Sequence, residues 1–245
     1  MKYNIVTVVN NSYFPFFEIW IKSLFDNVDL SNIASIYVID TGLHKNNKDF
    51  VCQFPKVHLW DTEIHSQFNG LHDAEWGKSN YAKLPVIKEI LLTDKIPTYF
   101  IDVDCVFLQD YYHLLDFDKD ITITTTADRK SLISTRFIGS FYGFNNVEKA
   151  HKFIDKWYGF ILEPERYAEA WKESPALCEV FDIFQEEYTF QILMEGQVSA
   201  SLFSPSSPET CIMHMKSEGA YGFKTPHQRL HMPFVIRHIE RYKHV

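Results

Sequence analysis

The sequence has no long apolar run, and this absence limits how the chain can meet a membrane. No stretch of its 245 residues reaches the roughly 18 consecutive apolar positions that a membrane-spanning helix needs. The opening segment Met1–Val9 is also too short for the apolar region of a secretion signal. We therefore expect a protein without a transmembrane segment, located in the cytoplasm.

Paired cysteines and an excess of positive charge are missing as well. The cysteines form no C-x-x-C pair, which argues against a zinc knuckle or a dense disulfide framework. We expect buried thiols at Cys52, Cys105, Cys178 and Cys211. The formal net charge is -8 at pH 7, whereas proteins that bind nucleic acid depend on clustered Lys and Arg. A nucleic-acid partner is therefore not expected.

The composition is that of a folded globular chain. Hydrophobic residues make up 46% of the sequence and charged residues 23%, so the buried apolar surface can offset the conformational entropy lost on folding. A chain of 245 residues ordinarily forms one domain with a large core. We therefore predict a single domain over residues 1–245.

Short β-rich runs alternate with helical patterns in the first hundred residues, which indicates parallel strands. We predict strands there at Tyr3–Val9, Ser35–Ile39, Val57–Trp60 and Thr98–Ile101, and helices at Phe14–Phe25 and Ser79–Thr93. Farther on, we predict strands at Ile121–Thr126, Gly139–Phe144 and Val198–Phe203, and helices at Val147–Ile161 and Glu186–Met194. Residues 163–184 have no clear period. The predicted class is α/β, with a mainly parallel central sheet flanked by helices.

Two carboxylates one residue apart follow the most apolar of these strands. Thr98–Ile101 leads directly into Asp102-Val103-Asp104, and α/β proteins bind ligands at the carboxyl ends of parallel strands. Such a pair can bind a hard cation, Mg²⁺ or Mn²⁺, together with substrate phosphates. The alternative is that the acids only cap the strand end. Their position between two apolar runs favours a bound partner, because a charge there needs one.

These segments resemble the GT-A glycosyltransferases, in particular the retaining family that includes glycogenin-like and lipopolysaccharide galactosyl- and glucosyltransferases. The similar segments are Ile5–Tyr13, Ser79–Asp104 and His214–Pro226, the last with a His, a Gly and a Lys in the family's order. Thr225 departs from the family pattern, because it separates Lys224 from Pro226. The resemblance implies a single Rossmann-like GT-A nucleotide-diphospho-sugar transferase domain. Residues 1–108 would form its nucleotide-binding half, and residues 109–245 its sugar and acceptor half with a C-terminal lid.

The resemblance also implies particular residues. Metal binding, of Mn²⁺ or Mg²⁺, is implied for Asp102, Asp104 and His214. Donor contacts are implied for Val9, Tyr13, Asp40, Lys83, Asp102, Val103, Gly139 and Lys224. Asp128 and Arg129 are positioned to border the sugar or acceptor. Other interpretations stay open: His214 as a structural histidine, Lys83 as a solvated helix residue, and Gly139 as a bulge or packing contact.

Glu186 and Glu187 open the helix predicted at Glu186–Met194, where the helix dipole alone favours acids. The resemblance implies that Glu187, or as the alternative Glu186, faces the anomeric carbon. The expected reaction is transfer of a hexose from a nucleotide-sugar, UDP-linked, to a hydroxyl of a glycan, lipid-linked or other acceptor, with retention. The alternatives are an inverting transferase with Glu187 as base, a haloacid-dehalogenase-like phosphatase with its nucleophile in the D-x-D motif, and a non-catalytic nucleotide-sugar-binding protein.

Overall fold

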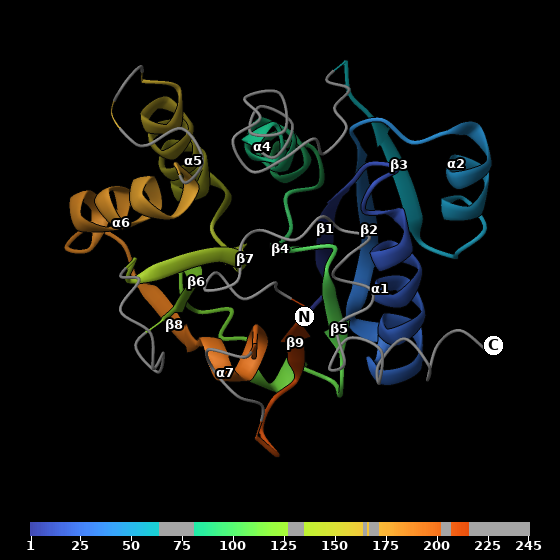
Figure 1. Cartoon of the computed structure of the whole chain (residues 1–245). Helices are drawn as coiled ribbons and strands as arrows, with labels where there is room; N and C mark the ends of the chain where they lie inside the picture. The colour runs from blue at the N-terminus through green and yellow to red at the C-terminus, as the bar shows by residue number, and fades with distance from the viewer. Residues whose placement is uncertain (64–80, 127–134, 164–165, 167–171, 202–206, 216–245) are drawn as a thin grey trace, which may run out of the picture.

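The computed structural model describes residues 1–63, 81–126, 135–163, 166, 172–201 and 207–215 (Figure 1). Its strands are β1 Tyr3–Val9, β2 Ile33–Asp40, β3 Val57–Asp61, β4 Thr98–Ile101, β5 Cys105–Phe107, β6 Ile121–Thr125, β7 Phe137–Phe144, β8 Phe190–Met194 and β9 Ile212–His214. Its α-helices are α1 Phe14–Asn27, α2 Lys45–Val51, α4 Lys83–Asp94, α5 Val147–Leu162, α6 Glu173–Phe184 and α7 Glu195–Val198, and 3₁₀ turns lie at Leu30–Asn32 and Tyr112–Leu114.

The central sheet has seven strands in the order β3-β2-β1-β4-β7-β6-β8. Strands β3, β2, β1 and β4 are mutually parallel, and β6 is parallel to β8. Within the described part of the chain, β7 is the strand of this sheet that runs the other way, antiparallel to both β4 and β6. The predicted α/β class and the mainly parallel sheet are therefore confirmed.

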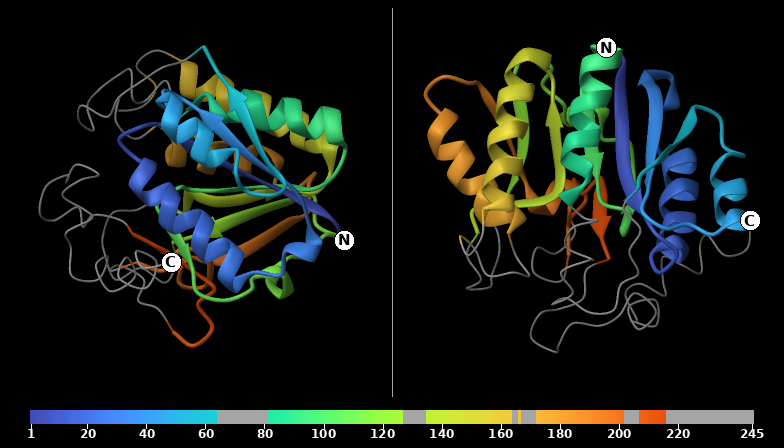
Figure 2. Two further views of the ribbon diagram at one scale, coloured as in Figure 1. Left: turned by 90° about the vertical axis from the view of Figure 1, so that its right-hand side faces the viewer. Right: turned by 90° about the horizontal axis from the view of Figure 1, so that it is seen from above.

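Two apolar layers cover the sheet. Helices α4, α5 and α6 pack over one face, and their buried residues form one cluster with Phe100, Tyr142 and Trp157. Helix α1 and the short strand β5 pack over the other face in a second cluster. Figure 2 shows the sheet between these two layers. The sheet is thus buried on both sides, as parallel sheets usually are.

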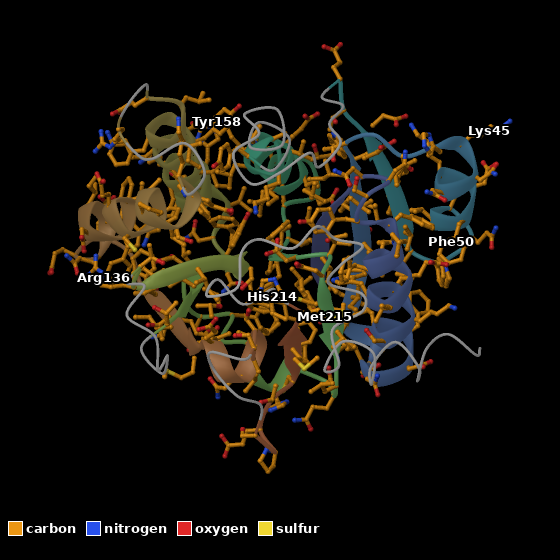
Figure 3. The ribbon with its side chains drawn as sticks, in the orientation of Figure 1. Lys45, Phe50, Arg136, Tyr158, His214 and Met215 are labelled. Atoms are coloured by element: carbon orange, nitrogen blue, oxygen red, sulfur yellow. The ribbon has the colours of Figure 1, made fainter. Side chains whose placement is uncertain are left out.

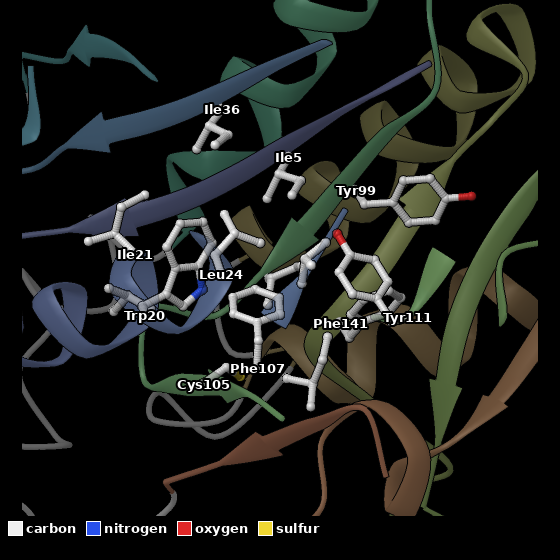
Figure 4. Packing of buried hydrophobic residues seen from close by; sticks show 14 of the residues in the cluster. Ile5, Trp20, Ile21, Leu24, Ile36, Tyr99, Cys105, Phe107, Tyr111 and Phe141 are labelled. Carbon is white, nitrogen blue, oxygen red and sulfur yellow. The ribbon is translucent and has the colours of Figure 1, made fainter. Parts of the chain in front are cut away.

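Strand β5 is held in place by aromatic packing against α1. The ring of Phe107 lies edge-on to Trp20 of α1 at 5.4 Å between centroids, and it stacks on Tyr111 at 5.9 Å (Figure 4). All three side chains are fully buried. Burial of each large apolar side chain contributes on the order of 2 kcal/mol. This packing fixes where the segment after the D-x-D motif runs.

One edge of the sheet collects several strand ends. Strands β1, β2 and β4 end there, at Val9, Asp40 and Ile101. Strand β7 begins at the same edge, because it runs antiparallel to β4. Strand β8 is parallel to β6, and β6 is antiparallel to β7, so β8 ends at this edge with Met194. We call it the carboxyl edge.

The helix predicted at Glu186–Met194 is wrong. Residues 186–188 form a turn, and Phe190–Met194 is strand β8, paired in parallel with β6. The start of β8 is anchored by Thr189, whose backbone N–H and hydroxyl both donate to the buried Asp120 carboxylate, at 2.8 and 2.9 Å. A five-residue run with four apolar residues fits either a helix or a strand, and pairing with β6 decides the outcome.

Two further expectations are corrected nearby. The strand predicted at Val198–Phe203 does not start where expected, because Val198 is the last residue of helix α7. Residues 202–206 lie outside the described residues. Helix α6 lies inside the segment for which the sequence showed no period. Its buried residues Ala176, Leu177 and Val180 do have helical spacing, but the aromatic and acidic residues around them conceal it. Cys52 is exposed and Cys178 is half-buried, against the expectation of buried thiols, whereas Cys105 and Cys211 are buried.

Candidate functional site

The D-x-D segment forms a tight turn between β4 and β5 at the carboxyl edge. The backbone N–H of Asp102 donates to the Ser140 carbonyl of β7 at 2.9 Å, and the N–H of Cys105 donates to the Asp102 carbonyl at 3.2 Å. Val103 packs into the core beside β5. Asp102 and Asp104 therefore lie on either side of a buried residue, Val103. The Asp102 side chain is 29% exposed and that of Asp104 11%.

Strand β9 brings His214 to these acids across 110 positions of sequence. Cys105 of β5 is paired with His214 in an antiparallel ladder, and the N–H of Met215 donates to the Asp104 carbonyl at 2.8 Å. The His214 Nε2 atom lies 2.9 Å from Asp104 Oδ1 and 3.9 Å from Asp102 Oδ2. Figure 3 labels His214, the last residue of β9, and the following Met215. Backbone pairing thus places the imidazole beside both carboxylates.

A buried group of potential metal ligands results from this pairing. One ligand atom each from Asp104, Cys105 and His214 lies within 4.8 Å of the others, so the group could hold a metal ion. Carboxylate oxygens suit Mg²⁺ and Mn²⁺, and imidazole nitrogen suits transition-metal ions. A thiolate favours softer metals. Cys105 belongs to the apolar core cluster, which leaves the Asp104 carboxylate and the imidazole as the polar part of the group.

Two buried serines lie behind His214. The Ser199 hydroxyl oxygen is 3.1 Å from His214 Nδ1, and it is 2.7 Å from the Ser140 hydroxyl oxygen. All three side chains are buried. No sequence motif marks either serine, because Ser140 lies in β7 and Ser199 follows α7, and only the fold brings them together.

The implied nucleotide residues gather at the ends of β1 and β2. The N–H of Thr41 donates to the carbonyl of Val9 at 3.0 Å, which ties the two strand ends together. One oxygen of the buried Asp40 accepts from two backbone N–H groups of the following loop, and the other lies 2.5 Å from the Lys48 ammonium. Asp40 therefore organises this loop. Tyr13 lies at the start of α1, half-buried against Phe16.

Lys83 is not a solvated helix residue. Its side chain is 1% exposed, and its ammonium lies 2.7 Å from the Glu173 carboxylate of α6 and 4.1 Å from the centre of the Phe100 ring. Burial, then the nearby carboxylates of Glu173 and Asp102, raise the pKa of Tyr142 well above its usual value. Glu173 of the ion pair and Asp102 of the D-x-D turn therefore both lie close enough to act on the Tyr142 phenol.

Gly139 approaches this ion pair from β7. A Cβ atom at Gly139 would overlap the carboxyl group of Glu173. A side chain at this position would therefore displace the Glu173 carboxylate from its present place, which gives the glycine a structural reason independent of any ligand.

Lys224, Asp128 and Arg129 lie outside the described residues. Their expected contacts with the donor or acceptor stay predictions.

Glu187 lies at the wrong edge of the sheet for its expected place. It is exposed in the turn before β8, whose amino end lies at the edge opposite the D-x-D turn. The placement beside the anomeric carbon is therefore wrong, because it depended on a helix that the chain does not form. The acid that follows the carboxyl end of β8 is Glu195, and it is fully buried. Reading residues 190–194 as a strand would have identified it.

The fold and this geometry define an α/β protein with a mainly parallel central sheet, compatible with a Rossmann-like domain, and with an acid-and-histidine cluster at the carboxyl edge of that sheet. Comparison with protein-family models and with curated proteins found no match for the chain. Among the described helices, none combines the length and apolar character that a membrane crossing requires.

Proposed function

We propose that the chain is a metal-dependent GT-A glycosyltransferase that transfers a hexose from a nucleotide-sugar, UDP-linked, to a hydroxyl acceptor. The observation that supports this most is the convergence of Asp102, Asp104 and His214, from two distant segments, at the carboxyl edge of a mainly parallel sheet. Ligand sites of α/β proteins lie at this edge.

The donor set fits a divalent cation. Asp104 and His214 are buried and adjacent, and Asp102 is the more exposed acid next to them. These three residues would hold the ion and leave its outer positions to the diphosphate. When bound, the ion supplies Lewis-acid stabilisation of the charge that develops on the departing nucleoside diphosphate.

The protein's own residues would then orient the donor. Asp40 keeps the loop after β2 in one conformation, and Tyr13 stands at the start of α1 as the aromatic surface proposed for the base. For the acid near the sugar, we replace Glu187 with Glu195, because Glu195 follows the carboxyl end of β8. Retention is the stereochemical course that the family resemblance favours.

Thermal unfolding with a panel of nucleotide-sugars, each with and without Mn²⁺, tests the proposal. A ligand at 100 times its Kd adds about 2.7 kcal/mol to the native state. For a domain of this size, that corresponds to a rise in Tm of roughly 5–10 °C. We expect a UDP-hexose to produce this rise only when Mn²⁺ is present.

Asp104→Ala should abolish the metal-dependent rise, and Asp26→Ala, which removes an exposed acid from α1, should leave it unchanged. A wild-type protein whose Tm responds to no nucleotide-sugar would overturn the proposal. Hydrolysis of p-nitrophenyl phosphate that Asp102→Asn abolishes would instead establish the phosphatase alternative. Binding without turnover of any UDP-hexose would favour a non-catalytic binding protein.

Stereochemistry is read from the product by NMR. An α-linked product from a UDP-α-hexose shows retention, whereas a β-linked product shows inversion and assigns the essential carboxylate to base catalysis.

A further inference from the structure

A chain of three hydrogen-bonding groups leads away from the acids into the protein interior. His214 Nε2 faces Asp104 at 2.9 Å, His214 Nδ1 faces the Ser199 hydroxyl at 3.1 Å, and that hydroxyl faces Ser140 at 2.7 Å. Ser199 is completely buried and Ser140 nearly so, at 2% exposure. Both hydroxyls are therefore shielded from water and depend on one another and on the imidazole.

The backbone holds Ser199 in this position. The Ser199 N–H donates to the Glu195 carbonyl at 2.8 Å and ends α7 there. The next residue, Ala200, donates to the Ile212 carbonyl at 3.1 Å and accepts from the His214 N–H at 2.7 Å. The segment that bears Ser199 is thus bonded to the strand that bears His214, on both sides of Met213.

The positions of the protons on His214 determine which hydrogen bonds Ser199 makes. An ionised carboxylate only accepts, so the 2.9 Å contact with Asp104 places a proton on Nε2 of His214. A metal ligand must instead present the lone pair of Nε2, and a neutral imidazole then carries its proton on Nδ1. Nδ1 would then change from acceptor to donor towards Ser199. A hydroxyl can both donate and accept, so Ser199 can serve either state by reversing its hydrogen bond with Ser140.

We propose that Ser199 is a positioning residue for metal binding, which accepts the Nδ1 proton of His214 in the tautomer that offers Nε2 to a divalent cation, with Ser140 as the terminal partner of the relay. The inference rests on the proposed metal site. Outer partners of this kind fix the tautomer and ring orientation of a metal-binding histidine, and their loss typically weakens metal affinity about 10–100-fold.

Substitutions at the two serines should have graded effects. Ser199→Ala leaves the Nδ1 proton buried without an acceptor when the metal is bound, so it weakens the metal complex more than the free protein. Ser140→Ala leaves Ser199 able to accept from His214 but removes the group to which Ser199 donates, so the loss is smaller. Ser199→Thr keeps the hydroxyl and should restore binding.

Mn²⁺ titration followed by the electron paramagnetic resonance signal of free Mn²⁺ measures this directly, without turnover. We expect Ser199→Ala to raise the Kd for Mn²⁺ about 10–100-fold. The matched control is Thr122→Val, which removes a buried hydroxyl of β6 that donates to Gln191 and has no part in the relay. The Tm of each metal-free variant shows whether the fold is intact.

The outcomes separate the two proposals. Wild-type protein that binds no Mn²⁺ refutes the metal-dependent function itself. Wild-type protein that binds Mn²⁺, with Ser199→Ala binding it equally well, refutes only the role of Ser199. A loss that Ser199→Thr does not restore also contradicts the relay, since a packing defect rather than the hydroxyl would then be responsible. Should Ser199→Ala fail to fold, unchanged Mn²⁺ affinity in Ser140→Ala overturns the inference.

Discussion

Replacing Glu173 with Gln tests the buried ion pair beside the D-x-D turn. The carboxylate of Glu173 lies 2.7 Å from the Lys83 ammonium, and the two side chains are 15% and 1% exposed. Gln preserves the size of the side chain and its hydrogen-bonding oxygen but removes the negative charge. The ammonium then stays in the interior without this counter-ion. Breaking a buried pair from one side costs about 3–5 kcal/mol.

Lys83→Met is the matched change on the other partner. Methionine keeps an apolar chain against the Phe100 ring, over which the ammonium lies at 4.1 Å. The carboxylate that remains on Glu173 is the more exposed member of the pair and reaches water more easily. We therefore expect a smaller loss for Lys83→Met than for Glu173→Gln. The double variant should recover most of the Glu173→Gln loss, because neither charge remains.

Thermal unfolding at neutral pH measures these differences. For a domain of this size, 1 kcal/mol shifts Tm by about 2–4 °C, so Glu173→Gln should lower Tm by roughly 10 °C. The double variant should unfold close to Lys83→Met. A Glu173→Gln protein with the wild-type Tm, or a double variant less stable than Glu173→Gln, would refute this account of the pair.

Gly139→Ala should lower Tm because its methyl group overlaps a carboxylate, whereas Gly159→Ala, in open space on α5, should leave Tm equal or slightly higher. Burial raises the pKa of Asp120, but hydrogen bonds from a lysine and a threonine outweigh it and bring the pKa below 3.8. The ionised Asp120 therefore stabilises the fold above that value, and this stabilisation is lost as pH falls through the folded pKa. Asp120→Asn should make the free energy of unfolding, measured by urea denaturation, depend less on pH in the acidic range. Glu195→Gln should lower kcat for a UDP-hexose at least tenfold with little change in donor affinity, while Glu187→Gln should match wild type; the reverse order refutes the assignment.

The first half of the sheet was predictable from the sequence because its strands are buried on both faces. Tyr3–Val9 and Thr98–Ile101 were expected as strands with the bounds that the structure has. Continuous apolar runs between turn residues identify such strands. The position of the D-x-D segment at the carboxyl edge followed from the same pattern, because it directly follows an apolar strand in an alternating α/β order.

The second half was less predictable because it depends on contacts between distant segments. Strand β8 lies at the end of the sheet, where Ile192 is 50% exposed, so the run has neither a buried-strand nor a helical pattern. The direction of β8 also determines which acid lies at the carboxyl edge. Because the sequence predicted a helix in place of β8, Glu187 was assigned to that edge instead of Glu195. The relay through Ser199 could not be predicted, since a serine has no distinguishing pattern until its partners are known.

The β5–β9 pairing links the assembly of the candidate site to the docking of a late segment of the chain. Asp104 belongs to a turn that forms with β4 and β5, whereas His214 is joined to that turn through the ladder with Cys105 and the hydrogen bond from Met215 to the Asp104 carbonyl. The ladder is three residues long; its β5 side packs on α1 through Phe107, and its β9 side packs there through Met213. A cation held by groups from both strands would add a direct connection where the backbone connection is shortest. Metal binding would therefore stabilise the docking of β9 as well as the site, because a ligand that binds only the docked state favours that state.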